Sequence, residues 1–292
     1  MNDVSVKERL KNLRKSSGKT FDELLILYGI ERLLYRLSVS EYQNQFILKG
    51  GALLYTLLEN KARVTRDIDV LARQIHNSKD NIKEIMKSVC QIEVDDALRF
   101  DAASILVDDI AEDDDYHGVR FVIIAYLGKA KIHLQMDIGF SDIIYPEPKE
   151  IEYPSLLELE APKLLGYPIE AVIAEKYEAM ISLGIRNSRY KDFYDILYLS
   201  QTHELDGTIL QRALVGTFQR RGTEFSVNIY ESDYLEGKEK LWNAFKQRIH
   251  SDISLSFTAV IEQIKSFLLP VQDACEKKIE FKRHWDGKIW KE

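Results

Sequence analysis

The hydrophobic pattern of this chain changes near Pro154, and the change constrains the fold more than any other feature. Before it, runs that alternate with a period of two are interspersed with helical runs, whereas only helical spacing follows it. Strands are expected at 46–48, 64–71, 98–107, 119–127 and 131–138, with a short hairpin turn at 128–130. Helices are expected at 20–37, 52–58, 78–90, 169–183, 189–199, 208–220, 234–249 and 257–269. The sequence therefore predicts an α+β domain over residues 1–155 and a helical bundle over residues 156–292.

Composition narrows the class of protein. The 292 residues are 45% hydrophobic and 30% charged, and they include only 14 glycines and 6 prolines, which favours a helix-rich globular chain. Membrane crossing needs a window of about 18 uncharged apolar residues, and the sequence has none. The two cysteines are far apart and lack CxxC spacing, so we expect reduced thiols in a cytoplasmic protein.

Charge is unevenly distributed along the chain. The net charge of −7 argues against a protein that coats nucleic acid with its whole surface. Residues 93–115 are strongly acidic, and they form either a solvated loop or a docking surface for a basic partner. Basic residues gather in the first 19 residues, at 186–191 and at 277–283. Each basic cluster is either a solvated helix face or a contact for a polyanion.

Asp67 and Asp69 form the first candidate site. Two residues apart on a strand, they share a face with Cα atoms about 6.6 Å apart, so both carboxylates can approach one hard cation. Mg²⁺ is usually bound by one or two carboxylates together with substrate phosphates. A bare DxD pattern is also common on solvated strand edges, so the pattern alone leaves both interpretations open.

The surrounding residues favour the metal site. Lys49, Gly50 and Gly51 lie where a strand-like run meets a helix, and glycines at a helix N-terminus let the backbone bind a phosphate closely. The alternative is a tight turn that requires a positive φ. Asp137, near the end of the last expected strand, could supply a third carboxylate. Three acids around one or two metal ions can activate a hydroxyl and stabilise a leaving pyrophosphate.

A second cluster falls in the helical half. Lys176 interrupts an apolar helix, and Arg189, Asp192 and Asp195 lie near the start of the next helix. Taken alone, these residues favour salt bridges between helices. They could equally neutralise a triphosphate or orient a ribose or base.

Five segments together resemble the motifs of the AbiEii/AbiGii-type nucleotidyltransferase toxin family, within the DNA polymerase β-like nucleotidyltransferase superfamily. They are FILKGGALLY (46–55), TRDID (65–69), LQMDIGFSD (134–142), YPIEAVIAEKYEAM (167–180) and NSRYKDFYDI (187–196). The superfamily often has a serine or threonine at or after the second glycine. Gly51 and Ala52 stand there in this chain and leave the backbone N–H groups to bind phosphate.

The resemblance implies a polymerase β-like domain with a small mixed sheet, followed by a helical bundle, with a nucleotide bound between them. It implies that Asp67, Asp69 and Asp137 bind Mg²⁺ and are catalytic together with Lys176. Nucleotide-binding positions would be Lys49, Gly50, Gly51, Arg66, Arg189, Asp192 and Asp195. Members of the family are toxins neutralised by an antitoxin, and some add nucleotides to the 3′ ends of tRNA.

The leading hypothesis is therefore a cytoplasmic, Mg²⁺-dependent nucleotidyltransferase that moves a nucleoside monophosphate from an NTP to an RNA acceptor, such as tRNA, and acts as a toxin. A metal-dependent phosphodiesterase is the alternative enzyme, because clustered carboxylates serve hydrolysis as well. A non-catalytic nucleotide- or RNA-binding module is the alternative from another class. Pyrophosphate release separates the two enzymes, and retained NTP binding without activity in Asp67→Ala would refute the pure binder.

Overall fold

The computed structural model describes residues 1–58, 62–110, 118–140, 144–225, 229–230, 232–249, 251 and 253–292. The chain forms two compact units. Unit 1 contains Met1–Glu59, Arg63–Ile143 and Pro148–Tyr167, and unit 2 contains Asn60–Ala62, Ile144–Glu147 and Pro168–Glu292. Unit 1 thus extends to Tyr167, beyond the boundary expected at residue 155, because a strand after Pro154 joins its sheet.

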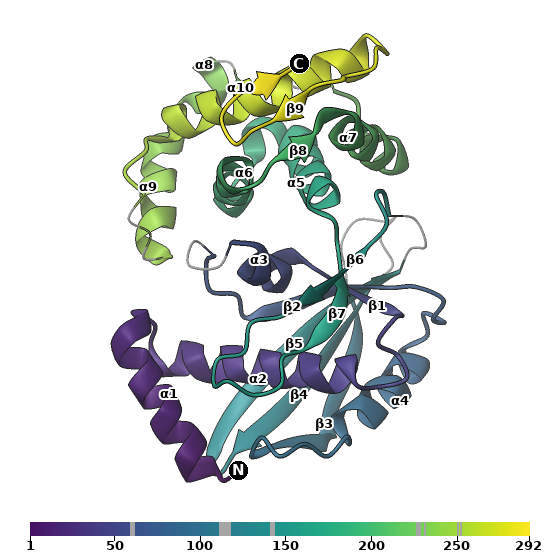
Figure 1. The fold of residues 1–292 in the computed structure, drawn as a ribbon, viewed down its shortest axis with the longest axis vertical. Helices are drawn as coiled ribbons and strands as arrows, with labels where there is room; N and C mark the ends of the chain where they lie inside the picture. Colours follow the sequence, from purple (N-terminus) through teal and green to yellow (C-terminus); the bar gives the residue numbers. More distant parts are fainter. Residues whose placement is uncertain are drawn as a thin grey trace. The chain divides into compact units, whose positions relative to one another are not determined.

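Unit 1 is built on a mixed sheet of seven strands (Figure 1). They are β1 (Phe46–Lys49), β2 (Asp67–Ala72), β3 (Leu98–Ile110), β4 (Gly118–Leu127), β5 (Ala130–Phe140), β6 (Lys149–Glu152) and β7 (Lys163–Gly166). Their order is β3-β4-β5-β2-β1-β7-β6, with β2 parallel to β5, β1 parallel to β7 and the other neighbours antiparallel. The α+β class and the mixed sheet are confirmed. β6 and β7 were not expected, because four residues are too few to show a period.

In the described part of unit 1 the helices are α1 (Asp3–Ser17), α2 (Phe21–Ser38), α3 (Gly50–Leu58) and α4 (Lys79–Cys90). Thr20 and Glu23 form the expected capping box in front of α2. Helix α1 was not expected, because its buried side chains are only Val6 and Leu10 and its apolar stripe is correspondingly narrow.

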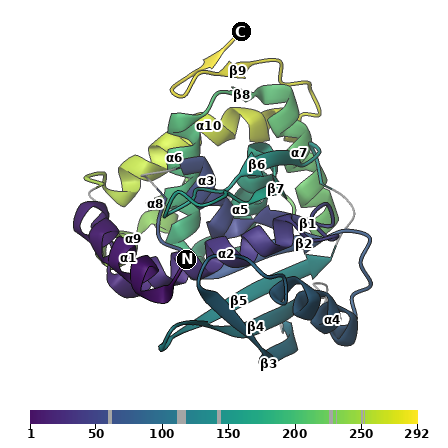
Figure 2. The same cartoon turned by 60° about the horizontal axis from the view of Figure 1, so that its bottom comes forward.

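Helices α2 and α4 cover one face of the sheet beside β3, β4 and β5 (Figure 2). A Cβ placed on Gly29 of α2 would lie 3.0 Å from the Leu134 side chain of β5, which shows how closely this helix packs. Ile132 and Leu134 point into this core, whereas Lys131 and His133 alternate to the opposite side and are exposed. We call that opposite side of β2, β3, β4 and β5 the outer face.

Unit 2 is mainly helical. Its helices are α5 (Ile169–Leu183), η2 (Gly184–Arg186), α6 (Tyr190–Thr202), α7 (Gly207–Arg221), α8 (Ser232–Leu235), α9 (Lys238–Arg248) and α10 (Phe257–Glu276). A small sheet accompanies them, with strands β8 (Leu205–Asp206), β9 (His284–Trp285) and β10 (Trp290–Lys291). In the described part of the chain, no helix is both long and apolar enough to cross a membrane.

The structure corrects two of the expected helices in unit 2. The run at 234–249 is split into α8 and α9, because Gly237 adopts a left-handed conformation with φ +70° that an α-helix cannot contain. Helix α10 continues beyond residue 269 and includes Pro270. Its buried stripe carries on through Val271 and Ala274, so packing outweighs the backbone hydrogen bond that proline removes.

Candidate active site

Asp67 and Asp69 lie on the outer face of β2. Ile68 and Val70, which alternate with them, are 0% and 1% exposed and point into the core. Asp67 is exposed and Asp69 is half-buried. The predicted strand and the shared face of the two aspartates are therefore confirmed.

Asp137 lies directly beside Asp69. Strands β2 and β5 run parallel, with Asp69 paired with Asp137 and Asp67 paired with Gln135. Residues paired across neighbouring strands share a face, so all three aspartates belong to the outer face. Arg120 of β4 binds both carboxylate oxygens of Asp137, through Nε and Nη2 at 2.8 Å each. Gln135 donates to the same carboxylate at 3.2 Å.

The residues of this face suit a hard divalent cation. Carboxylate oxygens are the ligands that Mg²⁺ prefers, and one or two protein carboxylates are enough when substrate phosphates complete its shell. Within the described ranges, no three His, Cys, Asp or Glu side chains stand together as a group ready to bind a metal. Asp67 and Asp69 remain the predicted metal ligands. For Asp137 to act as a third ligand, its carboxylate has to rotate away from Arg120.

Gly50 and Gly51 bring the backbone against these carboxylates at the start of α3. Gly50 has φ +63°, and a Cβ at this position would lie 1.9 Å from Asp69 Oδ2. A Cβ on Gly51 would lie 2.5 Å from Thr65 Oγ1. The positive-φ turn is therefore confirmed, and the absence of a Cβ lets the backbone approach Asp69 and Thr65 closely. Binding of a phosphate by Gly50 and Gly51 stays a prediction.

Lys49 and Arg66 flank this region. Lys49 pairs with Asp69 in the register of β1 and β2, and its Nζ lies 5.6 Å from the centre of the Tyr167 ring. Arg66 is exposed immediately before β2. Their assignment to nucleotide binding stays a prediction.

Thr65 and Arg120 are two polar residues near the aspartates that sequence reasoning missed. Thr65 is 5% exposed, and its hydroxyl donates to the Asp67 backbone oxygen at 3.0 Å. Arg120 faces Asp137 across the hairpin of β4 and β5, whose turn is Gly128 and Lys129. The expected turn at 128–130 would pair Arg120 with Ile138. The observed turn is one residue shorter and shifts the pairing to Asp137, so the sequence alone did not reveal this contact.

In unit 2, Lys176 joins helices α5 and α6. Its Nζ donates to Asp192 at 2.8 Å and to Asp195 at 2.7 Å, and Arg189 Nε donates to Asp192 at 2.8 Å. Burial opposes ionisation of Asp192, but the charges of Lys176 and Arg189 outweigh it and lower the pKa of this carboxyl. The four predicted residues are therefore brought together, and the expected salt bridge between helices is confirmed.

Another buried ionic cluster, in unit 1, includes a residue from the acidic stretch at 93–115. Asp96 is 0% exposed, and it accepts hydrogen bonds from Arg32 and from Arg36 of α2, the shortest at 2.5 Å. Asp96 is thus neither a solvated-loop residue nor part of a docking surface. The expectation for residues 111–115 of this stretch, and for Ser141 and Asp142 of a motif, lies outside the described residues.

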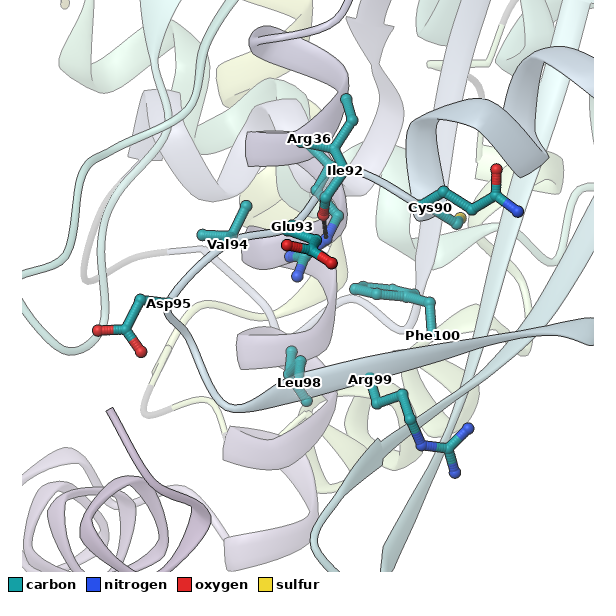
Figure 3. Close-up of a pocket in the computed structure, with 10 residues that line it drawn as sticks. Arg36, Cys90, Ile92, Glu93, Val94, Asp95, Leu98, Arg99 and Phe100 are labelled. Atoms are coloured by element: carbon teal, nitrogen blue, oxygen red, sulfur yellow. Dashed lines mark hydrogen bonds between the residues drawn. The ribbon is translucent and has the colours of Figure 1, made fainter.

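A hollow of about 580 Å³ lies beside this ionic cluster, between the end of α4 and the start of β3 (Figure 3). Arg36, Cys90, Glu93 and Phe100 are among its lining residues. Burial raises the pKa of the Cys90 thiol to about 12, so the thiol stays protonated at neutral pH. Both cysteines are free, as expected. The hollow lies at the opposite end of the sheet from the aspartates, since Arg99 pairs with Tyr126 near the hairpin turn.

The sequence matches a known protein family, and the fold is similar to that of a solved structure. A family model described as "Nucleotidyl transferase AbiEii toxin, Type IV TA system" matches residues 32–264. The crystal structure of a candidate nucleotidyltransferase from Helicobacter pylori is similar over 90% of this chain and 100% of its own, with a TM-score of 0.51 and 16% identity. JHP933 from Helicobacter pylori matches over 85% of this chain and 90% of its own, with a TM-score of 0.48 and 14% identity. No curated protein matches the sequence.

Proposed function

Because the chain belongs to the AbiEii nucleotidyltransferase toxin family, we propose that it transfers a nucleoside monophosphate from an NTP to RNA, with Mg²⁺, in the cytoplasm. The observation that carries the proposal is the outer face of β2 and β5, where Asp67, Asp69 and Asp137 share one side beside the backbone of Gly50. The family's place in a type IV toxin–antitoxin system implies an antitoxin as a partner. We further assign the fold to the polymerase β-like superfamily.

The site residues have distinct parts in this reaction. Asp67, Asp69 and Asp137 would bind Mg²⁺, which supplies charge stabilisation for the transferring phosphoryl group. The backbone of Gly50 and Gly51, at the start of α3, binds the triphosphate, aided by the charges of Lys49 and Arg66. The acceptor hydroxyl oxygen bonds to the α-phosphorus, the bond from that phosphorus to the β-phosphate breaks, and pyrophosphate leaves. The hydroxyl proton passes to a carboxylate of the outer face.

We also assign Lys176 to phosphate binding in the proposed reaction. Its contacts with Asp192 and Asp195 fix the position of Nζ, and Arg189 adds a second cation whose side chain is 48% exposed. An oriented ammonium group stabilises phosphate charge without reorganisation during the reaction. Asp192 and Asp195 are therefore positioning residues for Lys176 and Arg189.

Transfer of label tests the proposal. The purified protein is incubated with Mg²⁺, total tRNA and each NTP in turn, labelled at the α-phosphate, beside an Asp67→Ala/Asp69→Ala double variant. Label on RNA with the unmutated protein alone supports the proposal and identifies the donor. Shortened RNA without label would instead support a phosphodiesterase, and NTP binding without either product would support a binding module.

A further inference from the structure

The outer face of β3, β4 and β5 has a cationic end that the proposed chemistry does not use. Ile123, Ala125 and Leu127 of β4 are 0% exposed and point into the core, whereas Ile124 and Tyr126 are half-buried on the outer face. Figure 3 shows the same alternation on β3, where Phe100 points toward Arg36 and Arg99 extends away from it. Arg99 therefore belongs to the outer face.

Three residues of this end form a row across the strands. Arg99 pairs with Tyr126, and Tyr126 pairs with Lys131, so the three side chains are neighbours on one face. The Arg99 guanidinium carbon lies 4.6 Å from the centre of the Tyr126 ring. A guanidinium that lies over a ring presents its second face outward, and that face can stack on a nucleic-acid base.

The charges around the row favour an anion. Arg99 and Lys131 are exposed, as are Lys129 in the hairpin turn and His133 on β5. Asp101, paired with Ile124, is the nearest acid of the same face on β3. Its Oδ1 accepts a hydrogen bond from the Ala103 backbone at 3.2 Å, within its own strand. At the turn itself, Lys7 of α1 is paired with Asp3 at 3.0 Å.

The row continues toward the aspartates along a single strand. Lys131 and Asp137 are six residues apart on β5, a path of about 20 Å, and His133 and Gln135 lie between them on the same face. A single strand of roughly four nucleotides, at the short end of known single-strand site sizes, could cover such a path.

We propose that the row of Arg99, Tyr126 and Lys131 binds the single-stranded 3′ end of the acceptor RNA, whose terminal hydroxyl lies at the aspartates. The inference rests on the proposed function for the identity of the acceptor. Phosphates contact Arg99 and Lys131, and a base stacks on the Arg99 guanidinium. An acidic protein would also match the charges of the row. It would not explain the outward face of the Arg99 guanidinium, on which a base can stack, or the path along β5 to the aspartates.

Binding of a labelled single-stranded RNA of about 12 nucleotides, without NTP, tests the row. The variant is Arg99→Glu/Lys131→Glu, and the matched control is Lys83→Glu/Lys87→Glu on α4, which alters the charge equally on the covered side. We expect the variant to lose at least about tenfold in affinity at low salt, and the control to bind as the unmutated protein does. The slope of log K against log salt should fall by about 1.4, since each phosphate contact with a single strand contributes about 0.7.

A further variant separates stacking from charge. Arg99→Lys keeps the charge but lacks the planar guanidinium, so we expect intermediate affinity with an almost unchanged salt slope. All variants are first compared by thermal unfolding, because these side chains are exposed and should leave stability unchanged.

The possible outcomes decide the inference independently of nucleotide transfer. If the charge-reversal variant and the control bind RNA equally well, the row is not the site, whether or not the protein transfers nucleotides. If poly-L-glutamate displaces the RNA as effectively as unlabelled RNA does, the surface belongs to an acidic protein and the inference fails. Loss of RNA binding in the charge-reversal variant alone supports the row even if no transfer is found.

Discussion

At the residue scale, Gly50 leaves no room for a side chain. Any other residue in its left-handed conformation costs about 1–3 kcal/mol, and a Cβ here would also displace the Asp69 carboxylate, 1.9 Å away. We therefore expect Gly50→Ala to lose nucleotide transfer by at least about a hundredfold, together with this loss of stability. Labelled transfer and urea unfolding measure the two effects.

Gly222 provides a matched control for that variant. It has the same φ, +63°, but a Cβ there meets nothing within 4 Å. Gly222→Ala should show the backbone cost alone and keep full activity. Equal activities of the two alanine variants would show that the close approach of Gly50 to Asp69 is unimportant for the reaction.

Local signals were sufficient for part of the candidate site. Alternation along residues 64–71 predicts that Asp67 and Asp69 share one face, and the residue type of Gly50 allows the positive-φ turn that the structure contains. The pairing of Arg120 with Asp137 depends on the register between β4 and β5, and the spacing of residues within one strand does not reveal that register. The burial of Asp96 depends on α2, more than fifty residues away in sequence, and no local pattern marks it.

At the element scale, α5 and α6 are joined by a buried ionic group. Lys176 is 11% exposed, and Asp192 and Asp195 are 0% and 1% exposed. Asp192→Asn leaves Lys176 and Arg189 with one fewer counter-charge, and breaking a buried pair in this way typically costs about 3–5 kcal/mol. We expect a loss of that order in the free energy of unfolding at neutral pH, measured with urea.

The interaction of Asp192 with Lys176 and Arg189 makes the free energy of unfolding depend on pH with a definite sign. Because the folded protein lowers the pKa of Asp192 below its ordinary 3.8, this carboxyl stabilises the fold fully above that pH. The contribution is lost as the pH falls below 3.8 through the folded pKa. The difference in stability between the unmutated protein and Asp192→Asn should therefore shrink on acidification. A difference that stays constant or grows below pH 3.8 would contradict this assignment.

An exposed pair on another helix serves as the control. Asp273 of α10 and Lys277, which directly follows this helix, are 3.9 Å apart, and their side chains are 50% and 67% exposed. Exposed pairs contribute about 0–1 kcal/mol, so Asp273→Asn should change stability by less than about 1 kcal/mol.

Helix α2 is joined to the loop before β3 by a comparable buried group. Asp96 accepts from Arg32 and Arg36, whereas Asp95, next in the chain, has an 85% exposed side chain. We expect Asp96→Asn to lower the free energy of unfolding by about 3–5 kcal/mol and Asp95→Asn to change it by less than about 0.5 kcal/mol. Similar effects of the two substitutions in urea unfolding would mean that the arginines do not depend on Asp96.

At the scale of the whole molecule, the sequence and the structure agree best where one period runs uninterrupted. Helix α5 begins and ends where its apolar spacing predicted, at Ile169 and Leu183. The pattern from 234 to 249 is equally periodic, yet Gly237 splits it, since a single left-handed residue breaks a helix without disturbing the spacing. The small sheet of unit 2 was not predicted, because strands of two residues are too short to show a period. They depend on contacts between residues distant in sequence, such as the rings of Trp285 and Phe267, whose centres are 4.8 Å apart.

The central claim is tested most directly by the ratio of pyrophosphate released to nucleotide added to RNA. The account predicts one pyrophosphate for each nucleotide added. It also predicts a fall of at least about a hundredfold in Asp67→Asn/Asp69→Asn, since a metal site contributes several kcal/mol and each 1.36 kcal/mol is tenfold. Asp80→Asn/Glu84→Gln is the control, because both carboxylates are exposed on α4, on the covered side of the sheet. Unchanged pyrophosphate release in the Asp67/Asp69 variant, or RNA extension without pyrophosphate, would contradict the account.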